Sequence, residues 1–454
     1  MYLQNAMATI LETCRVPAPS GAAAELSVPL TFLDIPWLHF PHPIRRLLFY
    51  DYPCSKPHFL ETIAPKLKES LSVTLGHYLP AAGDLIFPLN SEKKAEIRYV
   101  AGDSAVSLTI AESGGDFDDH IGNHARDADQ FYEFVPQIDP VKDESEYQRV
   151  PVMALKVTLF PGRGICVGFA NLHCLGDGSS LVGFIQAWAS INKLGGDEEF
   201  LTKQAESLPI LDRSVVKDPA GIDTIFWKTI KEVPLKSSSF PLPTNRVRAT
   251  YILRPIDIEK LKYLVLAKKP GLIQVSSFVV TASYVWTCLV KSGEQVDDDV
   301  LEHFIFAADI RARIDPPVPA NYFGNCLDYG EARIEHKQLV GEQGFVMAVE
   351  AIADQIKNRI NKKDKVLKGV ENWLSEIEKM SGIRSLGVSG SPKFDLSTAD
   401  FGWGRARKLE VVSIDGEKHS VSLCKSRDSE GGLEVGVSLP RREWKLSQLS
   451  LMTG

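Results

Sequence analysis

The sequence lacks the cysteine pattern of a disulfide-bonded or zinc-binding protein. Its cysteines are seven among 454 residues, an odd number, and they form no CxxC pair or close cluster. They are Cys14, Cys54, Cys166, Cys174, Cys288, Cys326 and Cys424. An odd, dispersed set argues against a disulfide framework and against a structural zinc site, and it is typical of a reducing compartment.

Long apolar runs and an excess of positive charge are also missing. No stretch reaches the roughly eighteen apolar residues of a membrane span, and the residues from Met1 to Ile10 lack the basic start and apolar core of a secretory signal. The formal net charge is −7, with 51 Lys and Arg against 58 Asp and Glu. Such a balance provides no global positive field for nucleic acid or an anionic membrane. We therefore expect a cytoplasmic protein that binds neither nucleic acid nor membranes.

The common catalytic signatures are absent as well. The chain contains no GxSxG, no GxxxxGK[ST] and no HExxH, which excludes the commonest hydrolase, nucleotide-triphosphatase and zinc-protease readings. The glycines at 162, 164 and 168 miss the dinucleotide-binding spacing by one residue. His120 and His124 would suit a metal only on a helix, and Gly122 and Asn123 between them favour a solvated loop instead.

The composition and length that remain indicate a large folded protein. Hydrophobic residues make up 44% and charged residues 24% of the chain, which is ordinary for a water-soluble globular protein. A chain of 454 residues favours two comparable domains. We expect them at residues 1–195 and 248–454, with a crossover linker over 196–247, where periodicity fades and Phe240–Asn245 is most linker-like.

Helical and strand patterns recur in both halves of the chain. The N-terminal half predicts a helix over 57–78 and a hairpin over 154–172, followed by a polar turn and a second helix. The C-terminal half predicts helices over 257–268, 276–292 and 344–361, and strands over 304–308, 408–414, 419–426 and 433–439. This order indicates the mixed α/β class, in which helices pack on mixed sheets.

One motif lies where an apolar strand opens into this polar turn. His173 and Asp177 form an HxxxD pair, followed by Gly178 and a helical pattern. Two interpretations stay open: a buried histidine beside a helix-capping aspartate, or a side chain presented to a ligand from a rigid strand end. Cys174 is expected to be a small buried residue rather than a nucleophile.

A second motif, Asp400-Phe401-Gly402-Trp403-Gly404, lies near the C-terminus and places an aromatic residue between two glycines. Together the two motifs resemble the BAHD family of plant acyl-CoA-dependent acyltransferases, whose signatures are HxxxD and DFGWG in this order. The segments Leu30–Asp34, Leu71–Gly83, Asp309–Arg313 and Pro316–Pro317 also match the family's style. The resemblance covers nearly the whole chain.

The resemblance implies two chloramphenicol-acetyltransferase-like domains with a substrate channel between them. His173 is then the general base that takes the proton of the acceptor hydroxyl, so no acyl-enzyme and no metal are needed. Asp177 points away and pairs with an arginine, for which Arg311 is the candidate. The 400–404 loop is structural and shapes the channel, with Trp403 as its packing anchor. The protein is expected to be a monomer that uses acyl-CoA as a co-substrate and holds no permanent cofactor.

The segment Tyr322–Cys326 resembles the subgroup that malonylates anthocyanin, flavonoid and other phenolic glucosides. A malonyl group ends in a carboxylate, so its pocket needs a cation. The candidates are Arg45, Arg46, Arg311 and Arg313, and Ser276 and Ser277 are further substrate-binding candidates.

Two alternatives stay open. One is a transferase with an aromatic donor such as coumaroyl-CoA. The other is a catalytically silent protein that binds CoA or a glucoside. The intact His173 and DFGWG motif count against the second alternative, whereas the segment Arg441–Gly454, which is unlike the family's usual C-terminal helix, counts for it.

Overall fold

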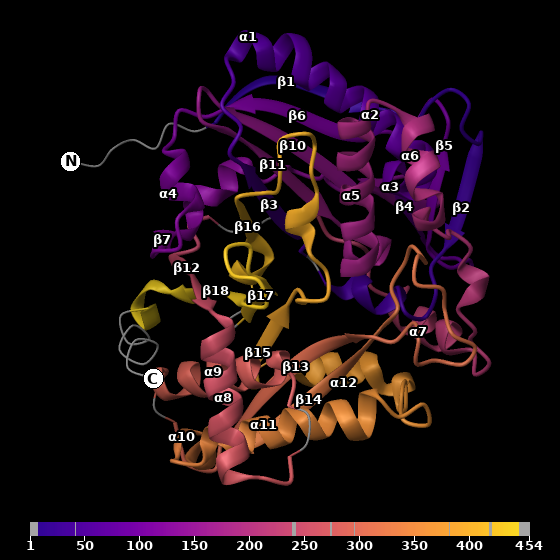
Figure 1. The fold of residues 1–454 in the computed structure, drawn as a ribbon. Coiled ribbons are helices and arrows are strands. Elements are labelled where there is room, and N and C mark those ends of the chain that lie inside the picture. The colour runs from indigo at the N-terminus through magenta and orange to yellow at the C-terminus, as the bar shows by residue number, and fades with distance from the viewer. Residues whose placement is uncertain are drawn as a thin grey trace.

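The computed structural model describes residues 8–40, 42–237, 242–272, 275–294, 296–380, 382–416 and 420–444. Helices pack on mixed β-sheets, so the predicted fold class is confirmed (Figure 1). The upper part of Figure 1, in indigo and magenta, holds mostly N-terminal elements, and the lower part, in orange, holds later ones.

The first sheet has six strands in the order β1-β6-β10-β11-β3-β16. They are β1 (Thr9–Val16), β6 (Val106–Glu112), β10 (Met153–Phe160), β11 (Gly164–Asn171), β3 (Ile44–Tyr50) and β16 (Lys408–Val411). β10 and β11 form the predicted antiparallel hairpin. β11 is buried along its whole length, because helices cover one face of it and a phenylalanine cluster covers the other.

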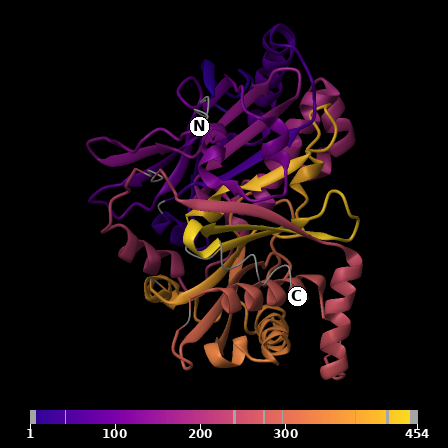
Figure 2. The ribbon, with the colours of Figure 1, turned by 90° about the vertical axis from the view of Figure 1, so that its left-hand side faces the viewer.

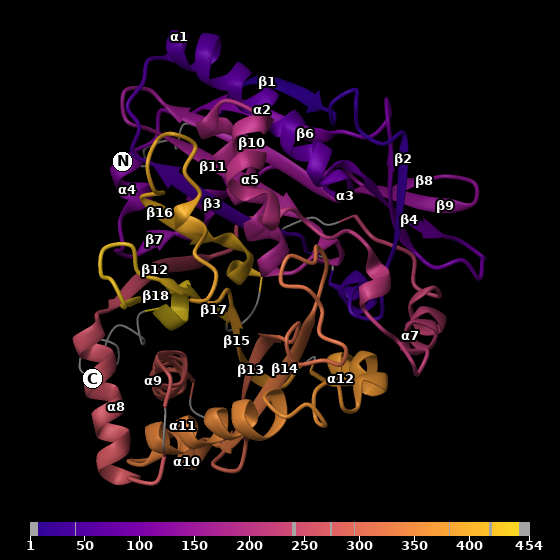
Figure 3. The same cartoon turned by 45° about the vertical axis from the view of Figure 1, so that its right-hand side comes forward.

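The remaining strands form two further sheets. The second, in the order β14-β13-β15-β17-β18-β12-β7, contains β14 (Leu327–Glu335), β13 (Leu301–Asp309), β15 (Arg384–Ser389), β17 (Ser420–Lys425), β18 (Leu433–Pro440), β12 (Arg246–Leu253) and β7 (Arg126–Asp127). The third contains β2 (Glu25–Pro29), β5 (Glu96–Val100), β4 (Asp84–Pro88), β9 (Tyr147–Pro151) and β8 (Lys142–Asp143). This third sheet lies to the right in Figure 3.

Helices cover the sheets on both halves. They are α1 (Lys56–His58), α2 (Ala64–His77), α3 (Leu79–Ala82), α4 (Phe117–Ile121), α5 (Gly178–Leu194), α6 (Asp197–Gln204), α7 (Ile222–Ile230), α8 (Pro255–Lys268), α9 (Ser277–Ser292), α10 (His336–Val340), α11 (Gly344–Gln355) and α12 (Trp373–Met380). The helix predicted over 57–78 is present as α1, a π-helical turn and α2, with Pro65 in the first turn of α2. Because these segments are continuous and Ile63 is helical, Pro65 lies inside the helix, directly after the π-helical turn, where its missing N–H removes one helical hydrogen bond.

Two strands cross between the halves of the chain. β16 pairs antiparallel with β3 in the first sheet, and β7 pairs antiparallel with β12 in the second. Figure 2 shows yellow C-terminal strands running beside the N-terminal elements. The predicted connecting region contains α6 and α7. The limits 1–195 and 248–454 stay a prediction, because each range contributes a strand to a sheet of the other.

Some predicted boundaries change. The strand predicted over 408–414 is wrong beyond Val411, where a 3-10 turn, η10 (Val412–Asp415), replaces it. Residue 419 of another predicted strand lies outside the described residues, as do 240 and 241 of the linker-like stretch. Of the segment that begins at Arg441, residues 441–444 form a helical turn with Trp444 buried, and 445–454 lie outside the description.

Candidate active site

His173 lies where a buried strand ends and a helix begins. β11 ends at Asn171, and a single 3-10 turn, η4 (His173–Leu175), follows it. Asp177 then caps α5, because its carboxylate accepts a hydrogen bond from the Ser180 N–H at 3.1 Å. The order strand, polar turn, helix is the predicted one. Since the strand and the helix are both anchored in the core, the turn presents its side chains from a rigid support.

Asp177 and Arg311 form a two-point ion pair. Arg311 donates from Nη1 to Oδ2 at 2.8 Å and from Nη2 to Oδ1 at 3.0 Å, and both side chains are buried. The Cys326 N–H donates to the same carboxylate at 3.0 Å. The contact predicted for Asp177 is therefore present. Because these donors occupy the carboxylate, Asp177 is engaged with the protein and cannot also serve as a free base.

The His173 imidazole lies flat against the indole of Trp37. The ring centroids are 3.6 Å apart, and the ring planes differ by 5°. Burial disfavours the charged imidazolium and lowers the pKa of His173 to about 4. The residue still keeps part of its surface exposed. At neutral pH the ring is therefore neutral. Ring Nδ1 is buried and has no hydrogen-bond partner among the described residues, so the exposed surface lies elsewhere on the residue.

Asp34 supports this turn through Asn325. The buried Asp34 carboxylate accepts hydrogen bonds from the Asn325 N–H at 3.1 Å and from Asn325 Nδ2 at 2.9 Å. Asn325 Nδ2 also donates to the His173 carbonyl at 2.9 Å. Arg213 lies 3.4 Å from the same carboxylate. A Cβ on Gly324 would come within 1.5 Å of the Arg213 guanidinium, so only glycine fits there.

The sequence interpretation missed Trp37, Arg213 and Asn325, and it gave Asp34 no role. A signal existed, because Asp34 and Asn325 belong to segments that carry the family resemblance, and Trp37 follows the first of them. The contact between these segments joins residues separated by 291 positions. No local pattern reveals a contact at that separation.

The four predicted cations are placed very differently. Arg46 is opposite Phe169 in the pairing of β3 with β11, on the face where α2 and α5 pack. The Arg45 side chain lies on the opposite face. Burial there lowers the pKa of Arg45, and the nearby Tyr132 and Asp415 partly offset this shift. Arg311 is held by Asp177, as described above.

The remaining candidates lie on the second half of the chain. Arg313 donates from Nε to Asn361 Oδ1 at 3.1 Å. Ser276 caps α9 by accepting a hydrogen bond from the Val279 N–H at 3.2 Å, and Ser277 is the first residue of that helix. Substrate contacts of these residues stay a prediction.

The second motif lies at the opposite end of α5 from His173. Asn192 Nδ2 donates to the Phe401 carbonyl at 2.7 Å, and Lys193 Nζ donates to Asp400 Oδ2 at 2.7 Å. α5 has 17 residues, so a rise of about 1.5 Å per residue separates the two motifs by about 25 Å. The structural role of the 400–404 loop stays a prediction.

The motif's own residues divide into a turn and an anchor. Asp400 Oδ1 accepts hydrogen bonds from the Gly402 and Gly404 N–H groups at 2.8 Å each, and both glycines have positive φ, +95° and +84°. Glycine adopts this conformation without strain. Phe401 is 1% exposed and packs edge-on against Trp188, whereas Trp403 keeps part of its surface exposed. Trp403 also packs against the core, with its ring centroid 5.3 Å from that of Tyr50 and 5.1 Å from that of Phe401. Its role as the packing anchor stays a prediction, and Phe401 is the more deeply buried of the two aromatic residues.

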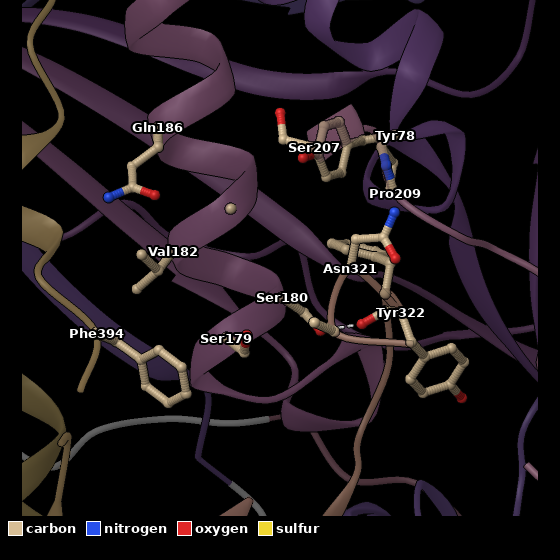
Figure 4. A pocket seen from close by; sticks show the side chains of 13 residues that line it. Tyr78, Ser179, Ser180, Val182, Gln186, Ser207, Pro209, Asn321, Tyr322 and Phe394 are labelled. Atoms are coloured by element: carbon tan, nitrogen blue, oxygen red, sulfur yellow. Dashed lines mark hydrogen bonds between the residues drawn. The ribbon is translucent and has the colours of Figure 1, made fainter. Parts of the chain in front are cut away.

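A cavity of about 200 Å³ adjoins the turn that carries Asp177 (Figure 4). Its wall joins α5 to segments that follow it in the sequence, and Ser180 Oγ donates across this boundary to the Tyr322 carbonyl at 3.4 Å. The wall consists of Tyr78, Ser179, Ser180, Val182, Gly183, Gln186, Ser207, Pro209, Ala320, Asn321, Tyr322, Phe323 and Phe394. Hydroxyl, amide and aromatic groups thus share one hollow beside the ion pair.

Other chemistry-bearing residues are accounted for without a ligand. Cys174 is buried, and burial raises the pKa of its thiol to about 12, as a structural cysteine requires. The solvated loop predicted for His120 is wrong, because His120 lies in α4 and is buried among phenylalanines. Within the described ranges, no three His, Cys, Asp or Glu side chains gather as a metal site needs.

None of the helices in the described part of the chain is long and apolar enough to cross a membrane.

Comparison with known proteins supplies the family. The family model described as "Transferase family" matches residues 6–448. The chain is 57% identical over 435 residues to a malonyl-coenzyme:anthocyanin 5-O-glucoside-6'''-O-malonyltransferase of Salvia splendens, covering 95% of this chain and 92% of that protein. It is 48% identical over 417 residues to phenolic glucoside malonyltransferase 1 of Nicotiana tabacum, covering 90% and 91%.

A solved structure supports the fold independently. The structure of vinorine synthase aligns with a TM-score of 0.70 at 17% identity, over 97% of this chain and 96% of that one. The family model and the two relatives confirm the resemblance drawn from the two sequence motifs. Given the family match over nearly the whole chain and the motif geometry, the chain belongs to the BAHD transferase family and is an acyltransferase.

Proposed function

We propose that this acyltransferase moves a malonyl group from malonyl-CoA to a sugar hydroxyl of a phenolic glucoside, most directly a flavonoid or anthocyanin glucoside. Acyl-CoA is its co-substrate, and the proposal includes no permanent cofactor. The two relatives compared above support it, since one is named for anthocyanin 5-O-glucoside and the other for phenolic glucosides.

The neutral imidazole of His173, a partly exposed residue, is the observation that carries the proposal. In the proposed reaction, the imidazole takes the proton of the sugar hydroxyl while the oxygen attacks the thioester carbonyl. The C–S bond then breaks, the CoA thiolate leaves, and the imidazolium returns the proton to it. The products are a malonate ester and free CoA, and the base is regenerated.

The other site residues hold this base in place. The Asp177–Arg311 pair holds the turn to the second half of the chain, and the Asp34–Asn325 contacts hold the His173 carbonyl. Trp37 fixes the plane of the ring. A stacked indole also offers its electron-rich face to the imidazolium that forms during the reaction.

The test uses the purified chain with malonyl-CoA and a mixture of phenolic glucosides. We expect free thiol to be released only when a glucoside is present, and a product heavier than its glucoside by one malonyl group. Coumaroyl-CoA, run in parallel, tests the first alternative, since equal or better use of it assigns an aromatic donor. Tight binding of CoA or a glucoside without thiol release assigns the silent binding protein instead.

Two further properties belong to this proposal. We expect the enzyme to act as a monomer and in the cytoplasm. Light scattering of the active protein and a fluorescent fusion in plant cells test these two points.

A further inference from the structure

Arg46 differs from the other cations near the site in having no acidic partner. Arg311 donates to the carboxylates of Asp177 and Asp309, and Arg213 lies against Asp34. Among the described residues, none forms a hydrogen bond or ion pair with the Arg46 guanidinium. The side chain is nevertheless partly buried.

The strand register determines the face of the first sheet on which the Arg46 side chain lies. On β3, Arg46 alternates with Leu48 and Tyr50 on the face that α2 and α5 cover. Its pairing partner on β11 is Phe169, and β11 leads directly into the turn that begins with His173. Arg46 therefore lies beside the strand that leads into the His173 turn, opposite a residue four positions before His173.

The charge of Arg46 also affects the pKa of two groups on other elements. The Arg46 charge lowers the pKa of His173, and it also acts on the thiol of Cys424 on β17. Both influences agree with a guanidinium on the α2 and α5 face of β3, where the register places Arg46. Burial lowers the pKa of Arg46 itself, yet a guanidinium remains protonated at neutral pH.

A partly buried cation without a counter-charge is costly, and a carboxylate that reaches it gains a charge-assisted, two-point hydrogen bond. In a malonyl thioester, a single methylene separates the reacting carbonyl from the free carboxylate. A base that serves this carbonyl and a cation that reaches the carboxylate would therefore engage the same acyl group. Acetyl and coumaroyl groups offer no charge to such a cation.

We propose that Arg46 binds the carboxylate of the malonyl group and is the residue that selects malonyl-CoA over uncharged acyl donors. The inference rests on the proposed function, because it assigns the donor specificity of that same site. Arg45 is the matched control, since it is the adjacent arginine on the same strand and points to the opposite face of the sheet.

The test compares kcat/KM for malonyl-CoA and acetyl-CoA with one glucoside. In Arg46→Met we expect the malonyl-to-acetyl ratio to fall about 10- to 100-fold, the usual worth of a hydrogen bond to a charged group, with acetyl transfer nearly unchanged. Arg46→Lys keeps the charge and should keep part of the preference. Arg45→Met should keep all of it.

Calorimetric binding of the two CoA thioesters without acceptor gives a readout independent of turnover, and malonyl-CoA alone should bind more weakly to Arg46→Met. An unchanged ratio in a folded Arg46→Met protein overturns the inference. If that variant does not fold, Arg46→Gln is read in the same way. A wild-type protein that does not prefer malonyl-CoA refutes the proposed function itself, so the two failures are distinguishable.

Discussion

The two ends of α5 carry the two signature motifs, and they are built differently. At the N-terminal end, Asp177 is buried and bound to Arg311 from the second half of the chain. At the C-terminal end, Asp400 meets Lys193, whose side chain is 53% exposed. The same residue type therefore forms a buried link between halves at one end and a solvated surface pair at the other.

The difference separates two tasks within one helix. A buried, fully bonded carboxylate fixes a turn in one geometry, because any movement leaves a charge unpaired. That rigidity is what a general base beside the turn requires. Asp400, whose side chain is 23% exposed, accepts from two glycine N–H groups of its own loop and from Lys193 at the end of α5. In the proposed function, the N-terminal end holds the base and the C-terminal end supports the loop.

The largest effect is expected for His173→Ala. Loss of the general base should lower kcat by about 10²- to 10⁴-fold while thermal unfolding and CoA binding stay near wild type. His124→Ala, which removes an exposed surface histidine, is the control. A folded His173→Ala protein that retains normal kcat would contradict the base assignment and remove the functional contrast between the two ends.

The next prediction compares the two ion pairs directly. Arg311→Met leaves the buried Asp177 carboxylate unpaired and should cost about 3–5 kcal/mol of unfolding free energy. Lys193→Met breaks an exposed pair and should cost less than about 1 kcal/mol. Urea unfolding measures both values. Arg311→Met combined with Asp177→Asn should be clearly non-additive, because the two side chains form one unit. If Arg311→Met and Lys193→Met lower the unfolding free energy by equal amounts, the contrast between the two ends of α5 is refuted.

The anchor at the C-terminal end is tested by two aromatic variants. Phe401→Ala opens a cavity beside Trp188 and should cost about 3–5 kcal/mol. Trp403→Ala should cost clearly less, because Trp403 is partly exposed. In conditions where both variants are folded, kcat should stay close to wild type. If Trp403→Ala is the less stable of the two variants, Trp403 is the packing anchor of this loop.

The smallest effect is a change in pH dependence. The reaction needs neutral His173, whose pKa is lowered to about 4, so kcat/KM should stay flat from neutral pH to about pH 5 and fall as the pH approaches 4. Trp37→Leu admits water to the ring and should move this midpoint up toward the ordinary histidine value of about 6.5. A wild-type midpoint near 6.5 would contradict the buried, desolvated base.

The same shift predicts a stability change at the N-terminal end. Between the folded pKa of about 4 and the unfolded value of about 6.5, folded His173 binds fewer protons than unfolded His173. Its contribution to stability is therefore complete above pH 6.5 and decreases as the pH falls toward 4.

Much of the fold was predictable from local sequence patterns. The alternation over 154–160 and the apolar run after Gly164 predicted the hairpin, since a strand buried on both faces needs such a run. The polar turn at 173–178 and the helical spacing after it predicted α5. Boundaries were less accurate, as at Val411, where tertiary contacts rather than propensity end the strand.

The sequence by itself determined the family, the position of His173 at a strand end and the aspartate that caps the following helix, because these depend on short motifs and local periodicity. Only the tertiary structure decided on which face of β3 each arginine lies, which aromatic residue of the second motif is more deeply buried, and that Trp37, Asp34 and Asn325 surround the turn. The reason is physical. A side chain's face and partners depend on strand pairing and on contacts across hundreds of residues, and adjacent residues such as Arg45 and Arg46 look alike until that pairing places them on opposite sides of a sheet.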